Sequence, residues 1–263
     1  MLVVYVALMI VGLAGIIFCK KKQKTNPNAQ TIAIAFVVVV LAGAGGMLYE
    51  TGTFGGDREM DRIIGNEIAF ATARSKVLAD YIGKTWNGET AVIITEPNIA
   101  QNKIAKAALD AMTANLKAAG ITVSGVEALK LSGGNADEPV PMEVALTAKV
   151  YNEIFDRNSN VNLFIIMSQL PFEVKELKNL KCWNFDTKKK RIVLVNGEIY
   201  NLKGAIAQGI VGAAVAMKTG PNAYDPEKAA PKDTQAAFDT RFILVTPQNV
   251  KDIAAQNKDL FAK

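Results

Sequence analysis

The sequence contains no histidine and only two cysteines among its 263 residues. Without histidine the chain cannot supply a Ser-His-Asp triad, a Cys-His dyad or an imidazole-ligated zinc site. These absences remove much of the catalytic repertoire. We therefore expect no metal and no cofactor, and we do not take catalysis as the leading hypothesis.

The chain also lacks a basic domain, although its formal net charge is +5. Residues 1–49 carry four lysines and no acidic residue, which leaves a net charge of only +1 on residues 50–263. Proteins that bind the phosphates of nucleic acids need a basic surface. The near-neutral main part of the chain therefore argues against nucleic-acid binding.

Two long apolar runs are present near the N-terminus, Leu2–Phe18 with 17 residues and Thr31–Tyr49 with 19. A hydrocarbon core about 30 Å thick is crossed by roughly 20 helical residues, with a range of about 17–25. The segment between the runs, KKKQKTNPNAQ, is short and polar. Residues 1–50 are therefore expected to form a transmembrane hairpin.

The lysines between Lys20 and Lys24 predict the orientation of this hairpin. The positive-inside rule places their loop in the cytoplasm, with the N-terminus and everything after Tyr49 on the extracytoplasmic side. A cleaved signal peptide is disfavoured because the basic residues follow the first apolar run instead of preceding it. The natural location for such a protein is a bacterial inner membrane with the main domain in the periplasm.

Small residues in the two runs, Gly12, Ala42 and Gly46, are candidates for close helix packing, either between the two spans or onto a partner helix. On the expected topology Cys19 and Cys182 lie on opposite sides of the membrane, so they cannot form a disulfide. Cys182 is then a buried small apolar residue or a bridge to a partner.

Residues 51–90 read as an exit segment followed by a long connecting helix from Asp57 to about Gly83, and residues 91–263 as an α/β domain. Five apolar, β-branched runs predict strands at Ala91–Thr95, Ile121–Val123, Val161–Ser168, Arg191–Asn196 and Arg241–Thr246. Helical patterns fall at about 99–119, 141–156, 172–181, 199–218 and 247–262. Near-continuous apolar strands alternating with helices predict a five-stranded, mostly parallel, doubly wound sheet.

Three further segments can be interpreted. Ala205–Met217 is too short to span a membrane and is expected to be a buried helix. Cys182–Phe185 is a candidate edge strand. The long stretch Thr219–Thr240 is a functional loop or a surface excursion. The order of elements is similar to a flavodoxin-like domain or to one lobe of the periplasmic binding proteins. The latter clamp a ligand between two lobes, and this chain has residues for one.

In an open α/β sheet, ligands bind at the carboxyl ends of the strands near the switch in strand order. The residues expected there are neutral or acidic and could bind a polyol, a sugar or an amino-acid-like ligand, or they could serve as helix caps and turn formers. They are Thr95, Glu96, Asn98, Ser132, Gly133, Ser168, Gln169, Asn196, Glu198, Thr246 and Gln248.

Known catalytic motifs are absent around these residues. Ser168 has no G-x-S-x-G context and no histidine to activate it. Ser132-Gly133-Gly134 lacks the lysine of a phosphate-binding loop, and no G-x-G-x-x-G follows the first strand. Glu96 and Glu198 could form a carboxylate pair or hold Mg²⁺ or Ca²⁺, but the spacing does not show that they converge.

Three hypotheses about function follow. The leading one is a membrane-anchored, non-catalytic accessory or scaffold subunit that docks onto other membrane or envelope proteins. The alternative is a membrane-tethered domain that binds or senses a small polar ligand at the strand ends. The third is a histidine-independent carboxylate enzyme.

Overall fold

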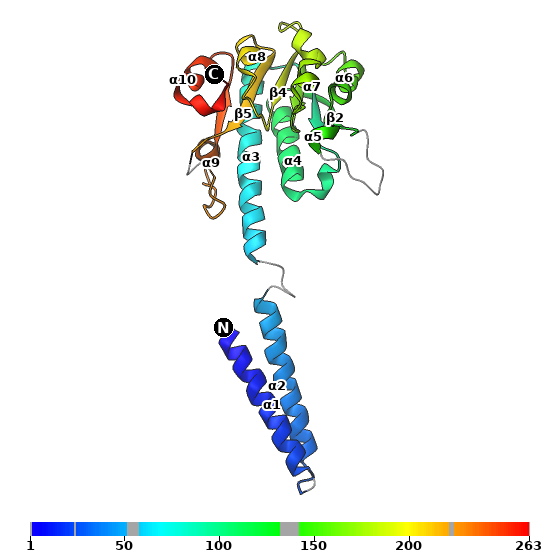
Figure 1. The fold of residues 1–263 in the computed structure, drawn as a ribbon, viewed down its shortest axis with the longest axis vertical. Coiled ribbons are helices and arrows are strands. Elements are labelled where there is room, and N and C mark those ends of the chain that lie inside the picture. The colour runs from blue at the N-terminus through cyan, green and yellow to red at the C-terminus, as the bar shows by residue number, and fades with distance from the viewer. Residues whose placement is uncertain (1, 24, 52–57, 132–141, 221–223, 263) are drawn as a thin grey trace. The chain divides into compact units, whose positions relative to one another are not determined.

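The structure is a computed structural model and describes residues 2–23, 25–51, 58–131, 142–220 and 224–262. Its internal contacts divide the chain into two units, Met1–Ile63 and Ile64–Lys263. Figure 1 shows a helical hairpin and an α/β domain. Most of the helix expected to connect them, from Ile64 onward, thus belongs to the α/β domain. We describe each unit separately.

The first unit consists of two antiparallel helices, α1 (Leu2–Lys22) and α2 (Ala29–Glu50), which pack along each other (Figure 1). Both are long enough and apolar enough to cross a membrane. Most of their large apolar side chains are not covered by the chain; Val3, for example, is 81% exposed. A helix pair that leaves this much apolar surface uncovered needs another apolar environment around it.

Glycines bring α1 and α2 close together. A Cβ atom added at Gly12 would lie 2.5 Å from Val40 Cγ2, and one at Gly43 would lie 2.9 Å from Met9 Cγ. Gly46 faces the Tyr5 ring in the same way. Ala42 is exposed and its neighbour Gly43 takes the contact position against α1, so for Ala42 only the expected contact with a partner helix stays a prediction. One residue along a helix rotates the side chain by about 100°, which moves Ala42 off the contact face.

The α/β domain contains one six-stranded sheet in the order β2-β1-β3-β4-β5-β6. The strands are β1 (Thr90–Thr95), β2 (Thr122–Ala128), β3 (Leu163–Ile166), β4 (Arg191–Leu194), β5 (Val211–Met217) and β6 (Phe242–Val245). All neighbouring strands pair in parallel except β5 and β6, which are antiparallel. The predicted fold class is confirmed, with six strands instead of five.

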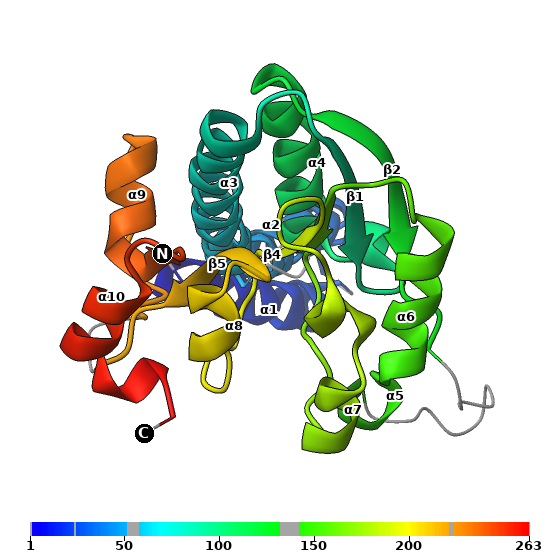
Figure 2. The same cartoon turned by 90° about the horizontal axis from the view of Figure 1, so that it is seen from above.

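Helices cover both faces of the sheet (Figure 2). The described helices and turns are α3 (Arg58–Trp86), η1 (Ile99–Gln101), α4 (Lys103–Ala118), α5 (Met142–Ala145), α6 (Ala148–Arg157), α7 (Val174–Lys178), η2 (Lys181–Asn184), α8 (Lys203–Ala207), α9 (Thr234–Arg241), α10 (Val250–Gln256) and η3 (Lys258–Leu260). Residues of α3, α4 and α9 bury one face of the sheet, and residues of α6, α8 and α10 bury the other. Successive side chains of a strand point to opposite faces of the sheet, so the core has two layers. Ile93 packs in the layer with α3, α4 and α9, and Ile94 packs in the layer with α6, α8 and α10.

The predicted helix over 199–218 is wrong, because this segment forms the short helix α8 and then the strand β5. Gly209 ends the helical turn with a φ of +78°, a conformation that glycine adopts without steric cost. The sequence after it, VGAAVAM, is buried at all but its last residue. A short apolar run that is buried on both faces has no period, so its composition fits a helix and a strand equally well.

Two other segments were interpreted from sequence. Cys182–Phe185 is not an edge strand: most of it lies in the turn η2, and Cys182 is fully buried. The expected irregular stretch 219–240 ends in the helix α9 from Thr234 onward, and its described part before α9 is tied to α3. Asn66 Nδ2 donates a hydrogen bond to the Lys228 carbonyl at 2.7 Å, and the Ala230 backbone N–H donates one to Asn66 Oδ1. This part of the loop is thus held to the domain by specific contacts.

The two-layer core predicts the effect of placing a charge in the sheet. Ile165 is fully buried in β3, between β1 and β4. Ile165→Asp should unfold the domain, since an unpaired buried carboxylate costs several kcal/mol and a domain has only about 5–15 kcal/mol of stability. Circular dichroism of the purified full chain in detergent measures the loss of structure. Val144→Asp is the control, because Val144 is 60% exposed. A cooperatively melting Ile165→Asp protein would contradict the described core.

Candidate functional site

The strand order places the topological switch of the sheet between β1 and β3. From β1 the chain passes to β2 on one side, and it returns to add β3 on the other side of β1. The connections leave in opposite directions and open a crevice beyond the carboxyl ends of the two strands, where ligands bind in open α/β sheets. Thr95 and Glu96 end β1 or follow it, and Ser168 and Gln169 follow β3.

Residues after three neighbouring strands line one cleft at this edge. Glu96, Gln169 and Glu198 contribute to it from the segments after β1, β3 and β4. We call this the strand-end cleft; its volume is about 440 Å³. The other residues that line it are Arg74, Asn196, Gly197, Ile199, Tyr200, Val215, Ala216, Met217, Thr219, Phe242, Asp259 and Leu260. Glu96 and Glu198, which the sequence could not place together, thus line the same cavity.

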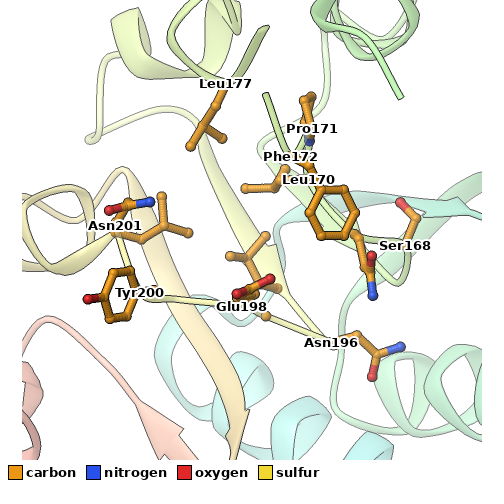
Figure 3. Close-up of a pocket in the computed structure, with 13 residues that line it drawn as sticks. Ser168, Leu170, Pro171, Phe172, Leu177, Asn196, Glu198, Tyr200 and Asn201 are labelled. Carbon is orange, nitrogen blue, oxygen red and sulfur yellow. The ribbon is translucent and has the colours of Figure 1, made fainter. Parts of the chain in front are cut away.

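A smaller pocket of about 130 Å³ adjoins the cleft and shares Gln169, Asn196 and Glu198 with it. Figure 3 shows Glu198 between two walls, with Tyr200 and Asn201 on one side and Phe172 on the other. Amide, carboxylate and aromatic groups are therefore presented together at this edge. Such a combination suits a small ligand that both donates and accepts hydrogen bonds.

Tyr151 of α6 holds the segment after β3 in place. Its hydroxyl lies 2.9 Å from Ser168 Oγ and donates a hydrogen bond to the Gln169 carbonyl. Burial raises the pKa of Tyr151 above its ordinary value, and the nearby negative charge of Glu96 adds to the effect. The phenol therefore stays protonated at neutral pH. Ser168 is buried in this hydrogen-bonded cluster, an arrangement typical of a structural hydroxyl.

Thr95 and Asn196 complete the polar layer at the strand ends. Thr95 is fully buried, and its Oγ1 has no hydrogen-bond partner among the described residues. The Asn196 side chain donates a hydrogen bond to the Met167 carbonyl at 3.1 Å, which links the ends of β4 and β3. Thr95 is thus buried below the surface at the strand ends and does not line the cleft, whereas Asn196 does.

Arg74 lines the cleft from α3 and was not predicted from the sequence. Its guanidinium carbon lies 5.4 Å from the centre of the Phe242 ring, and its buried Nε has no hydrogen-bond partner within the described ranges. Burial lowers the pKa of Arg74 to about 10, while the charge of Glu67 opposes this shift. Arg74 therefore remains charged at neutral pH. An arginine within a long helix has no motif around it, so nothing in the sequence marks this residue.

Thr246 and Gln248 do not belong to the cleft, which corrects the expectation from sequence. They follow β6, and because β6 is antiparallel its end lies at the opposite edge of the sheet. There the Tyr81 hydroxyl lies 3.4 Å from Gln248 Oε1. The Thr246 backbone N–H donates to Asn249 Oδ1 at 2.7 Å, which organises the turn before α10.

Asn98 is likewise absent from the residues that line the cleft and its side pocket. It adopts a left-handed conformation with a φ of +55° and makes no capping hydrogen bond. Asn102 caps α4 instead, where its Oδ1 accepts from the backbone N–H groups of Ile104 and Ala105 at 3.0 and 3.1 Å. The candidates Ser132 and Gly133 lie outside the described residues.

Within the described ranges, no group of three or more His, Cys, Asp or Glu residues is arranged to hold a metal ion. Cys182 is buried, and burial raises the pKa of its thiol well above the ordinary value. A thiol held in its protonated form is a poor nucleophile. The arrangement at the strand ends is therefore suited to hydrogen bonding and charge pairing with a ligand.

No family model matches the chain, and no curated protein matches it. Solved structures that resemble it include a periplasmic ribose ABC transporter protein from Conexibacter woesei (12% identity, TM-score 0.44) and the arabinose-binding protein AraP from Geobacillus stearothermophilus (13%, 0.45). A Caulobacter myo-inositol binding protein is 13% identical to this chain, with a TM-score of 0.44. The matches cover 71%, 69% and 69% of this chain but only 60%, 62% and 60% of those proteins. This similarity concerns the fold alone.

The Tyr151 cluster predicts a stability effect. Tyr151→Phe leaves Ser168 and the Gln169 carbonyl without their hydroxyl partner, and we expect a loss of about 1–3 kcal/mol. Thermal melting of the full chain in detergent measures it. Tyr200→Phe is the control, since Tyr200 is 49% exposed. Equal melting temperatures for the two variants would show that the Tyr151 hydroxyl does not stabilise the site.

Proposed function

We propose that the protein is a membrane-tethered domain that binds a small polar ligand in the strand-end cleft. The observation that carries this proposal is the convergence of Glu96, Gln169 and Glu198, from the ends of three neighbouring strands, onto one cavity at the carboxyl-end edge of the sheet. This was the alternative hypothesis from the sequence. The scaffold hypothesis, with docking onto other membrane or envelope proteins, stays a prediction.

The dimensions and chemistry of the cleft support this function. A volume of about 440 Å³ lies within the range of roughly 300–1,000 Å³ that is typical of small-molecule sites. Its polar lining includes amide groups at Gln169 and Asn196 and carboxylates at Glu96 and Glu198. Apolar side chains such as Val215 and Phe242 provide the remaining wall. A few convergent polar groups on a partly apolar surface are characteristic of ligand sites.

Catalysis is less well supported by the same geometry. Ser168 is engaged with Tyr151, and Cys182 is held protonated by burial. Glu96 and Glu198 line the cleft, and the sequence has no histidine that could share a proton with them. Binding without chemistry is the simpler function for this lining.

We further propose that α1 and α2 anchor the domain in a membrane. Lys20, Lys21 and Lys22 form the last turn of α1, and Lys24 follows in the sequence, so positive charge gathers at the α1–α2 turn. Under the positive-inside rule this end of the hairpin is cytoplasmic. The ligand-binding domain then lies on the extracytoplasmic side.

The binding proposal predicts stabilisation by a ligand. A panel of sugars, polyols and amino acids is screened by thermal shift on the full chain in detergent; a compound at 100 times its Kd stabilises by about 2.7 kcal/mol. Glu198→Gln should weaken binding of any hit by about tenfold or more, because hydrogen bonds to charged groups are worth roughly 1.5–3 kcal/mol. Glu153→Gln on the exposed side of α6 is the control. Absence of any stabilising compound would argue against the proposal.

The topology can be tested by cysteine labelling. In intact bacterial cells a membrane-impermeant maleimide should label Glu153→Cys but not Gln23→Cys, and both should react after lysis. The native Cys19 and Cys182 give little background because they are 6% and 0% exposed. Labelling of Gln23→Cys in intact cells would contradict the proposed orientation and indicate that the α1–α2 turn is extracytoplasmic.

A further inference from the structure

The strand-end cleft contains charges of both signs that do not neutralise one another. Arg74 and the carboxylates of Glu96, Glu198 and Asp259 all line it. In the described part of the chain none of these four residues forms an ion pair within 4 Å. Side chains that share a cavity without pairing are available to a ligand.

Arg74 is the most informative of these groups. Its Nε is buried without a hydrogen-bond partner among the described residues, although a buried polar group normally has one. Leaving such a donor unsatisfied destabilises a protein, and a charged donor costs more than a neutral one. An acceptor supplied from outside the chain would remove this penalty.

The carboxylate of Glu67 does not serve as this acceptor. Glu67 Oε1 lies 2.7 Å from Nη1 of Arg241, and Nη2 of the same arginine donates to the Asp225 carbonyl at 3.1 Å. Arg241 is thus satisfied within the fold, whereas Arg74 receives only longer-range attraction from Glu67. Glu67 is thus the near carboxylate of both Arg241 and Arg74, but among the described residues it forms an ion pair only with Arg241. The positive charge of Arg74 remains in the lining of the cleft.

We propose, on the basis of the proposed ligand-binding function, that the cleft recognises an α-amino acid. Its carboxylate pairs with Arg74, and its ammonium group is held by Glu96 and Glu198. The guanidinium is a planar fork that matches a carboxylate, and carboxylates are the usual acceptors for an ammonium ion. The lining carries three carboxylates against one arginine, which favours an amino acid with a second ammonium group, such as L-lysine.

A neutral sugar or polyol fits these observations less well. Hydroxyl groups could bind the amides and carboxylates, but they would offer the Arg74 guanidinium no charged acceptor. A purely anionic ligand would satisfy Arg74 and be repelled by Glu96, Glu198 and Asp259. The zwitterion is the ligand class that complements both signs of charge.

The decisive experiment compares L-lysine with analogues that lack one charged group. Isothermal calorimetry on the full chain in detergent measures binding of L-lysine, of cadaverine, which lacks the carboxylate, and of 6-aminohexanoate, which lacks the α-ammonium group. We expect each analogue to bind about tenfold or more weakly than L-lysine, because each leaves a buried or partly buried charge unpaired.

Variants then link each loss to its residue. Arg74→Gln should bind L-lysine about as weakly as cadaverine, and Glu96→Gln should remove the preference for L-lysine over 6-aminohexanoate. Without ligand, Arg74→Gln should melt at the same temperature as the parent chain or higher, because it removes a partly buried charge whose Nε has no hydrogen-bond partner among the described residues. A merely structural arginine would instead lower the melting temperature. Arg157→Gln, which loses a surface ion pair with Glu127, is the matched control and should bind normally.

The outcomes separate this proposal from the broader one. Binding of myo-inositol or D-glucose that is unaffected by Arg74→Gln but weakened by Glu198→Gln would overturn the amino-acid proposal and retain ligand binding in the cleft. Equal binding of L-lysine and cadaverine would overturn the role of Arg74. Failure of every compound would overturn both proposals.

Discussion

The central strands are buried on both faces, so the polar side chains that could bind a ligand occur at the ends of these strands. In β1 and β3 the residues that face either helical layer are apolar, as Ile93, Ile94 and Ile165 illustrate. A buried carboxylate or amide without a partner would cost several kcal/mol there. The groups able to meet a ligand are therefore gathered at one edge, and the switch in strand order between the parallel strands β1 and β3 opens that edge into a crevice.

The same constraint explains which features the sequence could predict. Near-continuous β-branched runs such as AVIIT and LFIIM are characteristic of strands buried on both faces, and they correctly placed the parallel core and its end residues Glu96 and Gln169. The run VGAAVAM was misassigned because alanine and glycine favour neither element strongly when both faces are buried. Its assignment to a strand depends on pairing with β4 and β6, which are contacts that no local window contains.

Contacts between distant parts of the chain also limited how much of the candidate site could be predicted from the sequence. Strand direction is not encoded in the residues of a strand, so the antiparallel pairing of β6 moved Thr246 and Gln248 away from the cleft. Arg74 lies on a helix before the first strand, and only the packing of α3 against the sheet brings it to the cleft. In the hairpin, a shift of one helical position separates Gly43, which contacts α1, from the exposed Ala42.

The reversal of β6 also shapes the chemistry of the site. A sixth parallel strand would have brought another polar strand end to this edge, whereas the antiparallel one brings the start of β6, where Phe242 lies beneath the Arg74 guanidinium. The ring offers its electron-rich face but accepts no strong hydrogen bond, so it holds the arginine without neutralising it. The cleft thus has an available cation in its lining together with carboxylates from the ends of β1 and β4. A ligand that carries both signs of charge can pair with groups that form no ion pair with one another among the described residues.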